Sequence, residues 1–71
     1  MALRRASEIA DEIGGIEDDL EAIQSERDAV AMYAEDEGPE PTAEQLEKLE
    51  RFLHSIATQA AGAVELIKQG R

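Results

Sequence analysis

Few residues of this sequence could carry out chemistry. His54 is the only histidine, and cysteine is absent. A metal site built from several histidines or thiolates of one chain is therefore excluded, as is a cysteine nucleophile. Ser7, Ser25 and Ser55 lack a histidine placed to activate them. We expect His54 itself to face solvent.

Glu47 and Glu50 form an acidic pair at a spacing that some enzymes use. In this spacing the pair resembles the Mg-dependent helical nucleotide pyrophosphohydrolases. That family also needs a second acidic pair on a later helix, and only Glu65 follows Glu50 in this chain. The acidic run at residues 35–40 lacks the ligand spacing of an EF-hand. We therefore predict a protein that is not an enzyme and has no catalytic, cofactor-binding or metal-binding residues.

An amphipathic helix is predicted over about residues 42–69. Apolar residues recur there at steps of three and four and fill positions a and d of a heptad repeat: Leu46, Leu49, Leu53, Ile56, Ala60, Ala63 and Ile67. The flanking e and g positions are apolar as well, which makes this stripe wider than one packing partner requires. We expect self-association through residues beside the stripe, namely Phe52, Ala57, Ala61, Val64 and Leu66.

A first helix is predicted over about residues 6–37, with a narrower stripe. Its a and d positions are Ala2, Ala6, Ile9, Ile13, Ile16, Leu20, Ile23, Arg27, Val30 and Ala34. Arg27 is expected to lie along the seam between the helices and to reach Glu26 or Glu50. Alternatively, Arg27 fixes the register or the oligomeric state, as polar residues at a positions sometimes do.

Gly14 and Gly15 interrupt the first helix on its outer side. A glycine in a helix interior costs about 1 kcal/mol relative to alanine. Two readings follow from the pair: either the helix kinks here, or the backbone of another chain approaches closely.

The segment 38–41 is predicted to be the loop between the two helices. Gly38 suits a left-handed helix cap, and Pro39 cannot continue a helix. Thr42 and Gln45 then have the spacing of a capping box for the second helix. We therefore predict an all-α fold, a single domain over residues 1–71 that forms an antiparallel two-helix hairpin. Because so short a chain without disulfides buries little core, we expect a homodimeric four-helix bundle.

The net charge of −10 is distributed unevenly. Residues 8–40 hold 13 of the 17 acidic side chains and one basic side chain, Arg27. Such a field repels phosphate backbones, so we expect no nucleic acid partner. No apolar run approaches the roughly 20 residues that cross a bilayer, and we expect a cytoplasmic protein with no membrane partner. The acidity has three alternative explanations: it keeps the protein soluble, it attracts a basic partner, or it is an adaptation to high salt.

The function predicted from these patterns is a small acidic protein–protein interaction module that binds itself and another protein. One alternative is an inhibitor of the kind that phages and mobile elements encode, which occupies a basic site of a host or defence protein. A remoter alternative is an oligomer that traps a small anionic ligand near Arg4, Arg5, Lys68 and Arg71. The candidate partner-binding residues are acidic: Asp11, Asp18, Glu21, Asp28, Glu35, Asp36 and Glu37.

Overall fold

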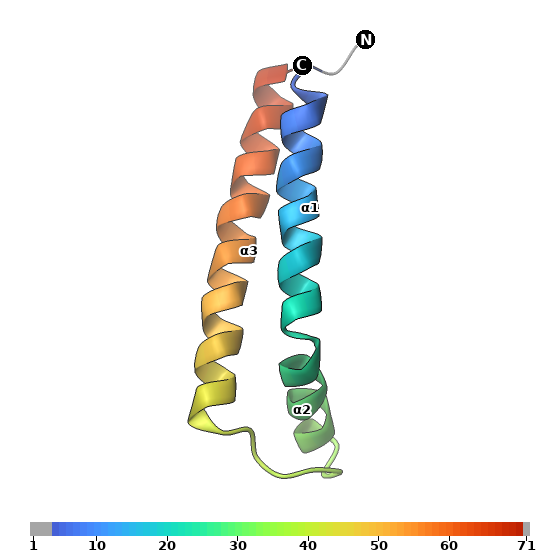
Figure 1. Ribbon diagram of the computed structural model, residues 1–71, viewed down its shortest axis with the longest axis vertical. Coiled ribbons are helices and arrows are strands. Elements are labelled where there is room, and N and C mark those ends of the chain that lie inside the picture. Colours follow the sequence, from blue (N-terminus) through green and yellow to red (C-terminus); the bar gives the residue numbers. More distant parts are fainter. Residues whose placement is uncertain (1–3, 71) are drawn as a thin grey trace.

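Residues 4–70, the part of the chain that the computed structural model describes, form three α-helices and no strand: α1 (Ala6–Ala22), α2 (Gln24–Ala34) and α3 (Ala43–Gly70). This confirms the predicted all-α class. α1 and α3 lie side by side and run in opposite directions, and the loop after α2 lies at the far end from both chain ends (Figure 1). The long dimension is 50 Å. Ala2, predicted to belong to the first stripe, lies outside the described residues.

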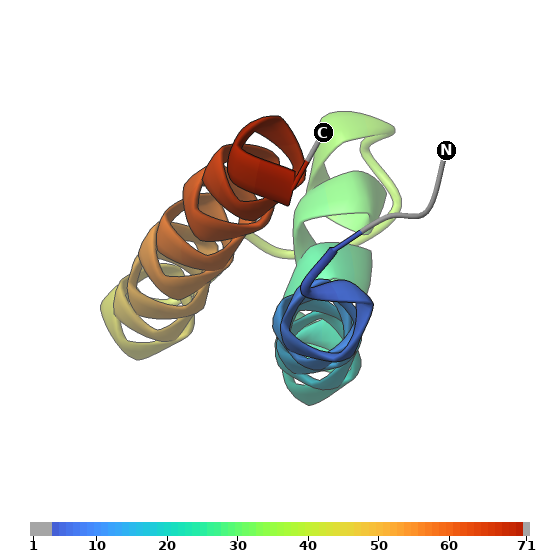
Figure 2. The same cartoon turned by 90° about the horizontal axis from the view of Figure 1, so that it is seen from above.

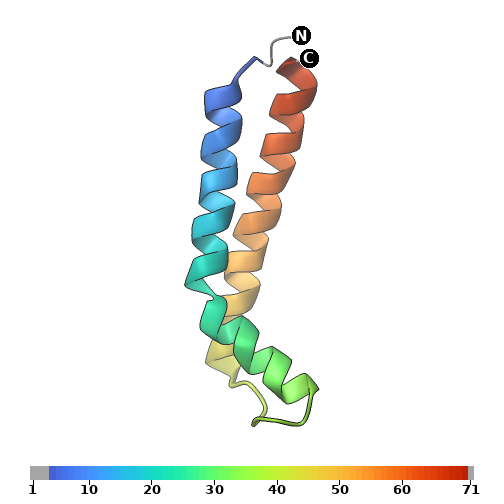
Figure 3. The ribbon, with the colours of Figure 1, turned by 90° about the vertical axis from the view of Figure 1, so that its right-hand side faces the viewer.

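The prediction of one continuous helix up to residue 37 is wrong, because the helix breaks at Ile23. Ile23 has φ −109° and ψ 15°, outside the helical region, and α2 leaves the line of α1 there (Figure 3). A continuous helix with the predicted seam would carry the guanidinium of Arg27 between the helices, where its desolvation is costly. With the break, the Arg27 side chain is 66% exposed and pairs with neighbouring Asp28 at 3.2 Å. The expectation that Arg27 lies along the seam is therefore wrong.

α2 ends in a cap that differs from the predicted one. The amide of Glu37 donates to Met32 O at 2.8 Å and that of Asp36 donates to Tyr33 O at 3.1 Å. These two bonds form a Schellman motif, in which the residue after the cap is left-handed. Asp36 takes that conformation, with φ 57°, whereas Gly38 has no positive φ. The prediction of Gly38 as the helix cap is therefore wrong, because the helix ends at Ala34, before Gly38 is reached.

The start of α3 confirms the predicted capping box. The amide of Thr42 donates to Gln45 Oε1 at 2.8 Å, and the amide of Gln45 donates to Thr42 Oγ1 at 3.2 Å. These bonds satisfy amides that have no partner inside the helix. Although α3 is the longest described helix, neither it nor the two others combine the length and apolarity needed to cross a bilayer.

The core between α1 and α3 is small. Ile9, Ile23 and Ala63 are the only buried hydrophobic residues among residues 4–70. Leu20 and Leu53, which we predicted to lie in the seam, are exposed by 50% and 48%. Seen from above, α1 is viewed nearly down its axis and α3 lies beside it at an incline (Figure 2). Each helix is thus turned about its own axis relative to the predicted packing.

The glycine pair does not kink the helix, since α1 continues through Gly14 and Gly15 without interruption. A methyl group at Gly15 would collide with the side-chain oxygen of Gln59 from α3, whereas one at Gly14 would meet nothing within 4 Å. The prediction of a kink is therefore wrong, and the close approach at Gly15 comes from a side chain of the same molecule. The approach of a second chain to Gly14 stays a prediction.

Candidate interaction surfaces

One flank of the seam between α1 and α3 is polar. Gln59 Nε2 of α3 donates to Asp19 Oδ2 of α1 at 2.6 Å and also lies within 3.3 Å of Ser55 O. Lys48 Nζ lies 3.3 Å from Glu26 Oε1, and the Glu26 side chain is only 13% exposed. The carboxylate of Glu12 lies beside Gly62. These contacts place three acidic residues, spaced seven apart on the first half of the chain, against α3.

The opposite flank of the seam is apolar and open to solvent. Ile13 and Leu20 directly follow Glu12 and Asp19, so they lie about 100° further around the helix, away from the polar contacts. On α3, Leu53, Ala57 and Val64 stand in the same rotational relation to Phe52, Ile56 and Ala63. In two antiparallel helices, residues with equal rotation about the seam come to the same side of the pair. We call Ile13, Leu20, Leu53, Ala57 and Val64 the apolar face.

The residues of the apolar face are about half exposed. The values are 45% for Ile13, 50% for Leu20 and 50% for Val64. Single exposed aliphatic residues are common on proteins, but a contiguous group of them is typical of an interaction site. The group continues toward the start of α3 with Leu46, which is also exposed.

The residues predicted for self-association divide between the two flanks. Ala57, Ala61 and Val64 are exposed on α3. Phe52 and Leu66 are partly buried and stand seven residues before and after Gln59, so they share its α1-facing side of α3.

The heptad positions of Ile13, Leu20 and Leu53 predict that these residues lie in the seam, and that prediction is wrong because all three are exposed. A signal was present in the sequence: Asp19 and Glu26 face Gln59 and Lys48, which can pair with carboxylates. Matching polar flanks on the two stripes would have predicted which flank turns inward.

The acidic outer surface of the molecule carries the predicted partner-binding residues of the helices. Asp11, Asp18, Glu21 and Asp28 are all exposed. Asp28 pairs with Arg27 on its own helix. Some acidic side chains of α1 therefore lie against α3, and others are exposed to solvent.

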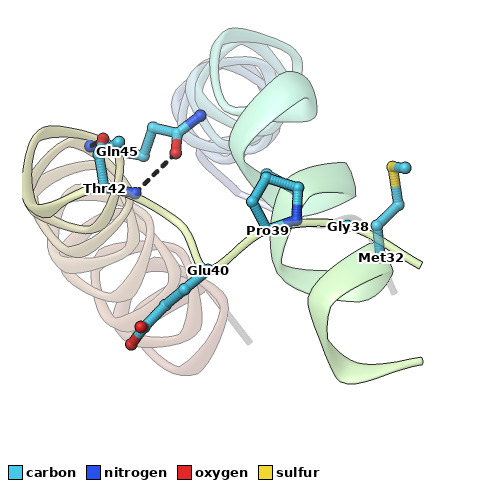
Figure 4. A pocket seen from close by; sticks show the side chains of 7 residues that line it. Met32, Gly38, Pro39, Glu40, Thr42 and Gln45 are labelled. Carbon is cyan, nitrogen blue, oxygen red and sulfur yellow. Dashed lines mark hydrogen bonds between the residues drawn. The ribbon is translucent and has the colours of Figure 1, made fainter. Parts of the chain in front are cut away.

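The loop end holds a second group of acids and a pocket. Glu35, Asp36 and Glu37 are exposed where α2 ends. Beside them, a pocket of about 390 Å³ lies between α2, the loop and the start of α3 (Figure 4). We call it the loop-end pocket, and it is lined by Ala29, Met32, Gly38, Pro39, Glu40, Thr42 and Gln45.

The opposite end carries the basic residues considered for an anionic ligand. Arg5 Nη1 donates to Gln69 Oε1 at 2.8 Å, and the amide of Arg4 lies 3.5 Å from Gly70 O. These contacts join the beginning of α1 to the end of α3. Arg71, the fourth base of this group, lies outside the described residues.

The residues with catalytic spacing lie on the outer side of α3. Glu47, Glu50, Arg51 and His54 line a shallow hollow there, and His54 is exposed as predicted. Within residues 4–70, no three side chains of the metal-binding types converge. All four residues that line the hollow come from α3.

No family model, curated protein or solved structure matches this chain.

Proposed function

We propose that this protein is a non-catalytic protein–protein interaction module of the cytoplasm, an antiparallel helical hairpin that pairs with a second copy to form a four-helix bundle. The observation that carries the proposal is the apolar face. A second copy covers Ile13, Leu20, Leu53, Ala57 and Val64, and the bundle then has the core that a single copy lacks.

The size of the core supports this assembly. Burying apolar surface stabilises a protein by about 25 cal/mol per Å². With three buried hydrophobic residues in its described part, the single copy gains little from this effect. Chains of this length without disulfides usually need either oligomerisation or closely packed helices. Covering half-exposed Leu20, Leu53 and Val64 supplies the missing burial.

The charge distribution supports the choice of the apolar face over the acidic surface for self-association. Asp11, Asp18 and Glu21 on one copy would repel the same residues of another copy. The apolar face carries no charge of its own, so two copies can meet there without burying an ion.

The test is the oligomeric state of two matched variants, measured by sedimentation over a range of concentrations. Leu53→Asp places a charge in the apolar face and should convert the dimer into monomers. Glu21→Arg changes a residue of the acidic surface and should leave the dimer intact. Circular dichroism of both variants establishes that the helices remain folded.

A monomeric wild-type protein at all concentrations would refute the assembly. So would a Leu53→Asp variant that dimerises as tightly as the wild type while keeping its helices.

A second candidate function is inhibition of a partner through a basic site, and it rests on the unused acids of α1. Asp11, Asp18 and Glu21 are exposed, whereas Asp19 is partly buried and accepts a hydrogen bond from Gln59 at the seam. A complex made through these residues should weaken steeply with salt, because charge attraction is screened. Reversing the three charges should abolish partner binding and leave the dimer unchanged, as measured by pull-down and light scattering.

A further inference from the structure

The loop-end pocket exists because α2 leaves the line of α1. The break at Ile23 turns α2 away from the line of α1, and the loop connects the end of α2 to the start of α3 (Figure 3). The loop and the two helix ends enclose about 390 Å³ (Figure 4). This is near the lower end of the range for ligand pockets, which is about 300–1,000 Å³. It is large enough for a bulky side chain.

The pocket walls favour an apolar side chain with positive charge beside it. Ala29, Met32 and Pro39 provide apolar surface, while Thr42 and Gln45 already satisfy each other in the capping box. The five charged residues between positions 35 and 44, which include the loop, are all acidic: Glu35, Asp36, Glu37, Glu40 and Glu44. No lysine, arginine or histidine occurs between Arg27 and Lys48. The field at the pocket is therefore negative.

The segment of residues 3–5 combines an aliphatic side chain with two adjacent bases. Leu3 is followed directly by Arg4 and Arg5, so one aliphatic side chain stands beside two guanidinium groups. Arg4 and Arg5 lie at the opposite end of the molecule, in contact with Gly70 and Gln69. Arg4 and the loop-end pocket lie at opposite ends of a molecule that is 50 Å long, and adjacent Cα atoms are only about 3.8 Å apart. The segment that contains Arg4 can therefore reach the pocket of a second copy and not the pocket of its own chain.

We propose that the loop-end pocket of each copy receives Leu3 from the second copy, with Arg4 and Arg5 over the acidic loop. The inference rests on the proposed dimer and adds the relative orientation of the copies. The two copies are then antiparallel: the loop end of each copy lies against the beginning of α1 and the end of α3 of the other, and a twofold axis relates the two filled pockets. Antiparallel packing puts basic residues beside acidic ones at both ends of the dimer, whereas parallel packing would put the two acidic loops together.

Cysteine crosslinking tests this orientation directly, because the chain has no cysteine of its own. Chains with Leu3→Cys are mixed with chains carrying Met32→Cys and are oxidised. Covalent dimers should form between the two kinds of chain, and neither kind should crosslink with itself. Crosslinking of Leu3→Cys with itself, or of Met32→Cys with itself, in preference to the mixed product would overturn the proposal.

The dissociation constant of the dimer gives an independent test. Arg4→Glu should raise this constant at least tenfold, and combining it with Glu40→Arg should restore most of the affinity. Arg51→Glu is the matched control, because it makes the same charge change on the outer side of α3, and it should leave the constant within about threefold. If Arg4→Glu behaves like Arg51→Glu while Leu53→Asp still dissociates the dimer, the pocket assignment fails and the proposed function stands.

Discussion

Gln59 of α3 lies directly over Gly15 of α1, and the same carboxamide group donates to Asp19 at 2.6 Å. The glycine leaves the space that the carboxamide fills. The absence of a side chain at Gly15 therefore allows Gln59 to take this position. The adjacent Gly14 faces open space and serves as a control.

The first prediction compares alanine at these two glycines. Gly14→Ala should raise the free energy of unfolding by about 1 kcal/mol, the usual gain in a helix interior. Gly15→Ala gains the same propensity but displaces Gln59 and its hydrogen bond to the Asp19 carboxylate, and such bonds are worth about 1.5–3 kcal/mol. Gly15→Ala should therefore lower the free energy of unfolding by about 0.5–2 kcal/mol, as measured by urea unfolding.

The background variant Gln59→Ala isolates the cause. With Gln59 already truncated, Gly15→Ala should stabilise as much as Gly14→Ala does. Equal effects of the two glycine substitutions in the wild-type background would contradict the packing described here.

The second prediction concerns the small core. Ile23 is 3% exposed, so Ile23→Ala should lower the free energy of unfolding by about 2–5 kcal/mol, the range for emptying an aliphatic site. Glu21 is exposed and close in sequence, so Glu21→Ala serves as the control. This substitution should change the free energy of unfolding by less than about 0.5 kcal/mol. Both are measured by denaturant unfolding at one fixed protein concentration. Similar effects at the two sites would mean that the break does not bury Ile23.

The third prediction concerns the end of α2. Asp36 has a left-handed backbone that costs L residues about 1–2 kcal/mol and costs glycine almost nothing. Asp36→Gly should therefore stabilise the protein, by about 0.5–1 kcal/mol in thermal or urea unfolding. Glu35→Gly, at φ −99°, should destabilise it instead. A loss of stability in the Asp36 variant would show that the cap lies elsewhere.

The fourth prediction concerns the ion pair between Lys48 and Glu26. Oε1 of Glu26 is buried and accepts no hydrogen bond within residues 4–70, so the ammonium group 3.3 Å away is its main electrostatic partner. Because Lys48 is 39% exposed, Lys48→Met should cost only about 1 kcal/mol. Lys68→Met removes an exposed lysine and should cost less than half as much. The effect of Lys48→Met should vanish when Glu26 is also changed to Gln.

Much of the fold could be predicted from local signals. The Thr42–Gln45 capping box and the spacing of apolar residues in α3 depend on a few neighbouring residues, and the structure reproduces both. The break at Ile23 has no such local signal, since neither glycine nor proline stands there. We relate the break to Arg27. A continuous helix would place its guanidinium at an a position between the helices, where removing it from water is costly.

The rotation of the helices was the part that spacing could not predict. A heptad repeat shows which residues share a side of a helix, but both flanks of a stripe are compatible with it. The prediction placed positions a and d, which include Leu20 and Leu53, in the interior. In the structure the flank of the first stripe that holds Asp19 and Glu26 turns toward α3 instead. The partners of the two acids, Gln59 and Lys48, lie more than 20 residues away, so only the paired helices bring them together.

The sparse packing of α2 also affects how the molecule opens. α2 has 11 residues, none of which is an apolar core residue, and a helix of that length is marginal in water without such packing. Its amide hydrogens should therefore exchange with deuterium through local opening, while those around Ile9 in α1 await global unfolding. The loop-end pocket is built on this least protected segment, so its occupation should slow exchange in α2 before it affects any other part of the chain.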